Sequence, residues 1–476
     1  MKERLKTFLL ISLVSISLLL TKRLWIELPH EVFGLFAKGD KVYSASYLLS
    51  DMIMPNKYLL NFNEKYLTLF YDDSKYRLWT NSRKIFANLL GSKDTKIVDL
   101  SDEEFLSYKR KPSMVFYFPE KVNTFILAKA LDVRDPSSIV DTIPNVKDIY
   151  IYLGKGDPFF VFTDGDRHTG IYDKAIDISE LKEQFMEIEK EKGYNYYYSA
   201  RDTYGIDKDI YIPYEMKNSL ATVYVENEIR NLDEEDKRKI AERYFGKSID
   251  YIREIVEGNE STIYEYNHRV LKLNINGTVE YYHPLEDTVK KRNLYESLST
   301  SAEFISQNAG ITKGMYLARV EELESGENLG YNLTFRYRVR GLPVILGNEE
   351  VVDFIQIEVF NNHIRSYKHF IRKDMNRAIG GMTEEIKLLT SQDIIDINYD
   401  FIVEEYLGAK KLKASKEESI KINQILSFIE DITLSYFDPC LKDMEDELIP
   451  VWAIRTETGL YAFNAYDGKL EYRRDK

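Results

Sequence analysis

An apolar segment near the N-terminus constrains the fold of this chain most. Its residues suit a lipid bilayer, whereas the residues that follow it must fold in water. The segment runs uninterrupted from Phe8 to Leu20, as FLLISLVSISLLL. A membrane-spanning helix needs about 20 residues, whereas the core of a cleaved signal peptide holds roughly 7–15. Length alone therefore favours a signal peptide that is removed after export.

The residues that flank this segment favour retention instead. The apolar core is followed by TKRLW, without the small residues that a cleavage site requires. Lys22 and Arg23 can extend to the lipid headgroups, and Trp25 suits the membrane interface. A helix from Leu5 to Ile26 would be about 33 Å long, which is enough to span a bilayer. We expect a retained single-pass anchor, with cleavage as the alternative.

The orientation of this anchor follows from what each side would have to carry. Lys2, Arg4 and Lys6 precede the apolar segment and Lys22 and Arg23 follow it, so the positive-inside bias is slight. The short N-terminal side holds nothing to translocate. We therefore expect a cytoplasmic N-terminus, with the bulk of the chain extracellular at the cell membrane.

Two serines give the anchor a second candidate role. Ser12 and Ser15 lie about 60° apart on one helical face. Small hydroxyl residues allow close packing and hydrogen bonds between membrane helices. A helix–helix contact in the bilayer is one interpretation, and serines that are merely tolerated are the other.

The composition describes an ordered body and excludes several classes of protein. Hydrophobic residues make up 44% of the chain, and its 36 Tyr and 24 Phe favour packing between sheets. The net charge of −13 argues against nucleic acid as a partner. The single cysteine, Cys440, excludes an intrachain disulfide framework and cysteine-rich zinc sites.

The patterning predicts an α+β fold in which a transmembrane helix precedes three extracytoplasmic domains with antiparallel sheets and packed helices. The expected divisions are the cytoplasmic tip and anchor, an N-terminal α+β domain, a central α+β domain and a C-terminal helix-plus-meander domain, at 1–28, 29–205, 206–380 and 381–476. In the second of these divisions a helix begins at Ser179, the expected cap, and buries Leu181, Phe185 and Ile188.

In the central domain, caps and turns mark the elements. Asp233 and Gly246 bound one expected helix, and a second repeats the pattern over 248–258. Asn276-Gly277 predicts a hairpin. In the C-terminal domain, helical spacing covers 391–408, and a strand and a final hairpin follow.

The last two domains are candidates for a shared unit. LPVI at 342–345 and IPVW at 449–452 each precede a strand–turn–strand. A helix followed by an antiparallel meander would explain both, but any two antiparallel meanders would look alike in this way.

One hairpin is the only candidate for chemistry. In TDGDRHTG, Asp164, Asp166 and His168 could converge on a metal ion or act in acid–base catalysis, which would make the chain an anchored cell-envelope hydrolase. The favoured interpretation is a polar hairpin tip, since the further ligands of a calcium loop are missing. No HExxH or GxSxG motif is present in the sequence. We expect no catalytic residue, cofactor or metal.

Three stretches resemble the YycH family. The central FGKSIDYIREIVEGNESTIYEYNHRVLKLNINGTVEYYHP is similar to that family's helix and hairpin, and MKERLKTFLLISLVSISLLLTKRLW resembles its retained anchor. The closing LIPVWAIRTETGLYAFNAYDGKLE resembles a terminal unit found in YycH, YycI and other cystatin-like domains. The likeness covers essentially the whole chain and is carried by the order and spacing of these stretches together.

The resemblance implies a non-enzymatic, membrane-anchored regulator from Gram-positive bacteria. Its expected partners are the sensor histidine kinase WalK, also called YycG, of the cell-wall two-component system and a YycI-like protein. The family has no catalytic residues to carry over. Its members differ in the sign of regulation, so both activation and inhibition remain open.

Overall fold

The computed structural model describes residues 45–476 apart from a set of short gaps. These gaps are 64–65, 72–74, 217–219, 221, 228, 311–313, 349–350, 352, 371, 375–386, 412–419 and 442–444. The expected anchor, with Ser12, Ser15, Lys22, Arg23 and Trp25, lies outside the described residues. Across the ranges that the structure covers, no helix is both long enough and apolar enough to cross a membrane.

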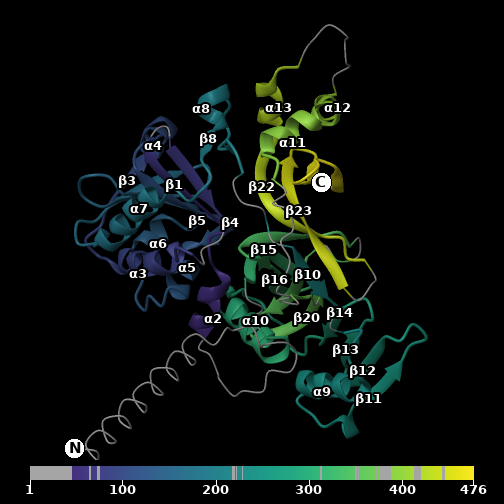
Figure 1. Cartoon of the computed structure of the whole chain (residues 1–476). Helices are drawn as coiled ribbons and strands as arrows, with labels where there is room; N and C mark the ends of the chain where they lie inside the picture. Colours follow the sequence, from purple (N-terminus) through teal and green to yellow (C-terminus); the bar gives the residue numbers. More distant parts are fainter. Residues whose placement is uncertain are drawn as a thin grey trace, which may run out of the picture.

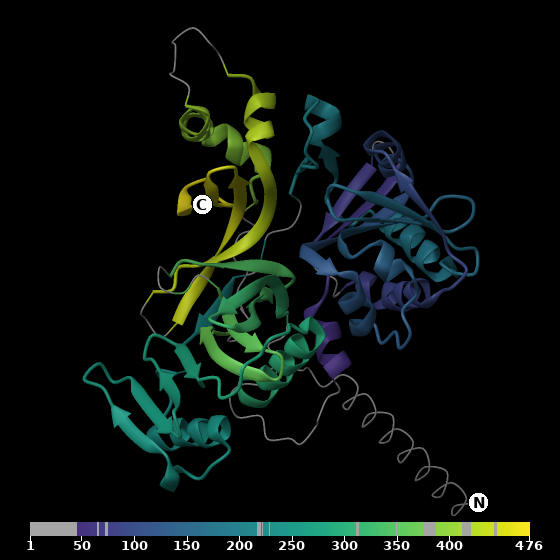
Figure 2. The same cartoon turned by 180° about the vertical axis from the view of Figure 1, so that it is seen from behind.

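Three sheets with packed helices form the described part of the chain, which is the mixed α+β class expected from the sequence (Figures 1 and 2). The first sheet has nine antiparallel strands. In spatial order they are β3 (Lys96–Leu100), β7 (His168–Tyr172), β6 (Phe159–Thr163), β5 (Asn145–Tyr152), β4 (Ser113–Asn123), β1 (Lys57–Asn63), β2 (Tyr66–Phe70), β8 (Tyr197–Ser199) and β9 (Tyr211–Pro213).

Side chains alternate along each strand, so the first sheet has two faces, and different helices cover them. On one face, Phe116 packs edge-on against Phe86 of α3, and Phe62 packs against Phe185 of α7. The opposite face carries Tyr150, which α4 covers. The helices of this body are α3 (Leu78–Gly91), α4 (Asp102–Lys109), α5 (Thr124–Ala130), α6 (Ile139–Thr142), α7 (Ser179–Glu191) and α8 (Ala200–Tyr204).

The second sheet forms the central body and is also antiparallel. Its order is β11 (Arg253–Val256), β12 (Thr262–Tyr266), β13 (Arg269–Leu273), β14 (Thr278–Tyr282), β20 (His363–Phe370), β19 (Ile355–Phe360), β16 (Asn328–Arg336) and β15 (Tyr316–Ser325). Helices α9 (Glu234–Phe245) and α10 (Leu294–Asn308) pack on it, and α2 (Ala45–Met52) packs on α10. The hairpins β11–β13 project away from the other sheets (Figure 1).

The third sheet collects strands that are far apart in the sequence. Its members are β17 (Arg338–Val339), β18 (Leu342–Leu346), β22 (Ile429–Asp438), β23 (Glu445–Thr456), β10 (Val223–Glu226), β21 (Lys373–Asp374), β24 (Gly459–Asn464) and β25 (Leu470–Asp475). Its helices are α11 (Ser391–Ile397), α12 (Tyr399–Lys410) and α13 (Ile422–Phe428). Unlike the antiparallel sheet that the sequence predicts, it contains one parallel pair, β18 with β22.

Several local predictions are confirmed where the signal is carried by neighbouring residues. Asp233 caps α9 by accepting a hydrogen bond from the backbone N–H of Asp236, and Gly246 ends this helix at a φ of 62°. The Asn276-Gly277 turn joins β13 to β14 as an antiparallel hairpin.

Two local predictions are wrong. The first residue of α7 is Ser179 rather than its cap, because the carboxylate of Asp177 accepts the Ser179 backbone N–H at 2.9 Å. The expected helix over 248–258 is a single 3₁₀ turn, η1 (Ile249–Tyr251), followed by strand β11. Pairing with β12 along the whole of β11 outweighs the local helix signals, since tertiary context overrides propensity.

Candidate functional site

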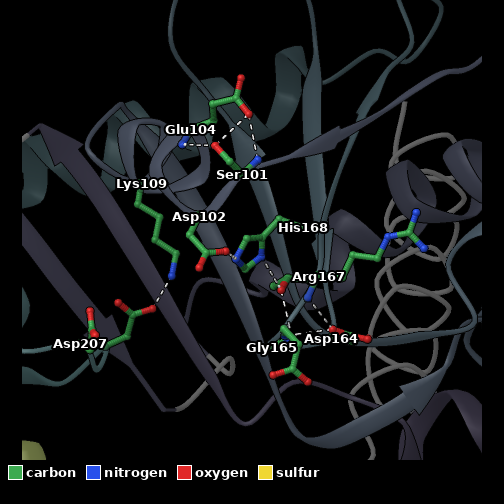
Figure 3. A network of polar contacts seen from close by, with 12 residues as sticks. Ser101, Asp102, Glu104, Lys109, Asp164, Gly165, Arg167, His168 and Asp207 are labelled. Atoms are coloured by element: carbon green, nitrogen blue, oxygen red, sulfur yellow. Dashed lines mark hydrogen bonds and ion pairs between the residues drawn. The ribbon is translucent and has the colours of Figure 1, made fainter.

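The hairpin that carries the sequence-predicted site is a tight polar turn between β6 and β7 (Figure 3). Asp164 folds back on the turn, and one of its carboxylate oxygens accepts the backbone N–H groups of Asp166 and Arg167 at 3.0 and 2.9 Å. These hydrogen bonds lower the pKa of Asp164, with the one from Arg167 the largest cause. Gly165 supplies the positive φ of 103° that the turn requires.

The other two candidate residues, Asp166 and His168, contact different parts of the protein. The Asp166 side chain is 90% exposed and lies 3.3 Å from the Lys121 ammonium. The His168 ring has Thr163 Oγ1 at 2.7 Å from Nδ1 and Asp102 Oδ1 at 3.3 Å from Nε2. Both imidazole nitrogens are therefore engaged within the protein.

The environment of His168 favours its neutral imidazole. The ring stacks on Phe105 at a centroid distance of 4.4 Å. Partial burial, followed by the charge of Lys109, lowers the pKa of His168. Among the residues that the structure describes, no three His, Cys, Asp or Glu side chains are arranged to hold a metal ion. The Asp164 carboxylate stabilises the turn, the Asp166 side chain faces Lys121, and His168 contacts α4 through Asp102 and Phe105.

Helix α4 is placed by its own sequence and by one ion pair. Ser101 and Glu104 form a reciprocal capping box at its N-terminus, with three acidic residues in the first turn that favour the helix dipole. At its other end, Lys109 forms an ion pair with Asp209, which also binds Arg201 at 3.1 Å. The capping box stabilises the first turn of α4, and the Lys109–Asp209 ion pair ties its C-terminal end to the segment before β9.

The face of the first sheet beneath α4 contains a carboxyl group that the sequence did not indicate. Asp148 on β5 is half-buried beside Tyr117 of β4, and the hydroxyl of Tyr117 lies 3.3 Å from that of Tyr211. Burial raises the pKa of Asp148 to about 6, although Lys109 and nearby lysines act in the opposite direction. No motif marks this residue, because its neighbours come from β4, β9 and α4.

A groove of about 470 Å³ runs between edge strand β3 and α4. Lys96, Val98 and Leu100 line it from β3, and Tyr108 and Lys111 line it from the α4 side. The sequence did not indicate this surface. Neither β3 nor α4 carries a binding motif of its own, and the groove forms only where the two elements lie side by side. Asp99, Glu104, Ser107 and Tyr172 complete its lining.

The described elements thus define a mixed α+β scaffold in three parts, whose polar clusters brace the fold. No protein-family model and no curated protein matches the sequence. The crystal structure of YycH from Bacillus subtilis matches with a TM-score of 0.55, over 87% of this chain and 96% of that one, at 13% identity. The resemblance to YycH seen in the sequence is confirmed at the level of the fold.

Two other solved structures match less well. One is an uncharacterized protein from Eubacterium rectale, with a TM-score of 0.33 and 12% identity over 57% of this chain and 85% of that one. The other is the YpeB C-terminal domain from Bacillus megaterium, with a TM-score of 0.25 and 12% identity over 51% of this chain and 97% of that one. These two scores are too low to support a shared fold.

Proposed function

We propose that this chain is a non-enzymatic, membrane-anchored regulator of a cell-wall-linked two-component system. It forms an extracytoplasmic complex with a sensor histidine kinase of the WalK (YycG) type and a YycI-like protein. A single-pass helix holds it in the cell membrane, with the N-terminus in the cytoplasm. The observation that carries the proposal is the fold match to YycH, which spans nearly the whole of both chains.

The contacts of the candidate hydrolase residues favour the same conclusion. Asp164 is occupied by the backbone of its turn, and His168 by Thr163 and Asp102. Asp166 is directed to Lys121. A general acid or base must reach a substrate proton, and these three side chains do not meet at one point from which they could do so. Among the residues that the structure describes, no contact favours the anchored hydrolase as a second function.

A regulator without chemistry can act only by binding the two signalling states of its target unequally. Such couplings are typically about 1–3 kcal/mol, which changes a signalling equilibrium by about 5–150-fold. The Lys57–Asp431 ion pair joins the first sheet to the third, and α2 joins the first body to the central one, so the three parts offer a large ectodomain surface for this purpose. Contact between membrane helices at Ser12 and Ser15 is a second place where the difference could arise.

The complex can be tested in membranes of the source organism. The full chain, tagged at its C-terminus, is cross-linked in intact cells and purified, with an unrelated single-pass protein carrying the same tag as the control. We expect selective recovery of a sensor histidine kinase with an extracellular domain. The kinase is then reconstituted in vesicles with and without this chain. Recovery of no kinase, or unchanged kinase autophosphorylation, would contradict the proposal.

A further inference from the structure

Strand β3 is an edge of the first sheet. On one side it pairs with β7, from Lys96 opposite Tyr172 to Leu100 opposite His168. On its other side, no strand or loop among the described residues hydrogen-bonds its backbone. Such an edge presents free N–H and C=O groups to which an extended chain can add as a further strand.

The groove beside β3 has a floor suited to side chains of an added strand. Phe159 lies between Tyr108 and Tyr172, with ring centroids 4.5 and 4.3 Å away. Val98 projects onto the same face, since a Cβ added at Gly170 would meet Phe159 at 2.9 Å and Val98 at 3.0 Å. A free strand edge beside an aromatic groove combines backbone pairing with a pocket for alternate side chains, which is how proteins bind extended peptides.

The tyrosine end of the groove carries positive charge without a described counterion. Lys96 is exposed opposite Tyr172, and the ammonium of exposed Lys111 lies 4.1 Å from the centroid of the Tyr108 ring. The hydroxyls of Tyr108 and Tyr172 are 3.2 Å apart, so both lysines belong to this end. Within the described ranges, neither lysine has a carboxylate at ion-pair distance.

Two acidic residues also line the groove. Asp99 binds Arg167 at 2.8 Å, whereas the Glu104 carboxylate accepts hydrogen bonds from Ser101 in the capping box of α4 and keeps its own charge near Tyr172. Lys96 and Lys111 together exceed this one carboxylate, so the excess charge at the tyrosine end is positive. An acidic side chain is the complementary group.

We propose that β3 and α4 bind an extended segment of a partner protein by strand addition. An acidic side chain of this segment lies between Lys96 and Lys111, and an apolar side chain covers Tyr108 and Tyr172. The proposal deepens the proposed function, on which it rests for the expectation that the partner is a protein. The segment that binds this surface need not belong to a kinase.

The test uses the full chain in lipid nanodiscs and a displayed library of short random peptides. We expect enriched peptides to alternate apolar and polar residues and to carry Asp or Glu near one end. Binding of a labelled enriched peptide is measured by fluorescence anisotropy. The double variant Lys96→Glu/Lys111→Glu should weaken it by at least about fivefold. Lys190→Glu, which reverses an exposed lysine on α7 of the same body, is the matched control and should have no effect.

Hydrogen exchange then locates the bound peptide. Strand addition should slow exchange of amides in Lys96–Leu100, whereas a ligand that only stacks on the tyrosine rings, such as a sugar chain, would leave them unprotected. The proposal fails if no acidic peptide is enriched, if the lysine double variant binds as wild type does, or if β3 gains no protection. A chain that binds such peptides but recovers no kinase would retain this site and lose the proposed function.

Discussion

Lys57 on β1 and Asp431 on β22 form an ion pair that joins the first sheet to the third, with 2.7 Å between Nζ and Oδ1. Burial would raise the pKa of Asp431, but Lys57 and then the hydroxyl of Thr433 together hold it below its ordinary value. The two residues are 374 positions apart in the sequence. The pair therefore fixes the arrangement of two bodies rather than the fold of one.

Replacing Lys57 by Met should loosen this junction. The Asp431 side chain is 39% exposed, so solvent screens the pair and we expect a loss of only about 0.5–1 kcal/mol. Because the pKa of Asp431 is depressed, this stability is present above its ordinary value of 3.8 and is lost as pH falls through the lower folded value. Urea unfolding of Lys57→Met, Asp431→Asn and the double variant measures the coupling. Additive losses would show that the pair contributes nothing.

Replacing Arg372 by Met should be far more costly. Its guanidinium binds Asp438 at 3.0 Å and also binds Asp446, and all three side chains are no more than 2% exposed. Removing the cation takes the Arg372 counter-charge away from two buried carboxylates, which costs about 3–5 kcal/mol. Chemical denaturation measures the loss. A variant that also carries Asp438→Asn and Asp446→Asn should recover part of it, and no recovery would locate the cost in packing instead.

The pH dependence of the central body should follow His369. This side chain is 2% exposed, its Nδ1 lies 2.8 Å from the Tyr367 hydroxyl, and burial lowers its pKa to about 3. The unfolded chain therefore takes up a proton below pH 6.5, while the folded chain does not. Stability should fall by about 2 kcal/mol between about pH 6.5 and about pH 5. His369→Phe should flatten this slope, and an unchanged slope would assign it to other groups.

Trp452 on β23 should be essential to the third sheet. Its ring is 1% exposed, and its indole N–H donates to the Leu389 carbonyl at 3.0 Å. Trp452→Ala should cost about 3–5 kcal/mol, measured as a shift in thermal melting of the ectodomain. Trp452→Phe retains most of the buried area and should lose less. Equal losses in the two variants would assign the cost to the hydrogen bond.

The parts of the fold that the sequence predicted are those specified by near neighbours. The cap at Asp233, the stop at Gly246 and the Asn276-Gly277 hairpin each depend on a few consecutive residues. The helix expected over 248–258 does not form, because β12 pairs with part of that segment. The local residue pattern does not indicate which strand a segment will pair with. The parallel contact of β18 with β22 likewise joins strands that are distant in the sequence.

The candidate site shows the same limit. The turn at Asp164 could be read from its own sequence, since Asp and Gly are common turn residues. The contact of His168 with Asp102 depends on where α4 crosses the sheet. The groove between Lys96 and Lys111 exists only once β3 pairs with β7. Sequence patterns therefore identified individual polar residues and not the surfaces that they share.

Substitutions at the β6–β7 turn separate the regulator from the hydrolase. Asp166→Asn should change the free energy of unfolding by no more than about 0.5 kcal/mol, since its side chain is 90% exposed. His168→Asn should cost about 1 kcal/mol, because it removes the contact with Phe105. Neither change should alter control of a co-expressed kinase, measured with a transcriptional reporter in cells that contain equal amounts of each variant. A hydrolase that used these side chains would lose activity with both variants while the ectodomain stayed folded, as judged by circular dichroism. Lost control in a folded Asp166→Asn protein would restore the turn as a functional site, because the change leaves the size of the side chain almost unaltered.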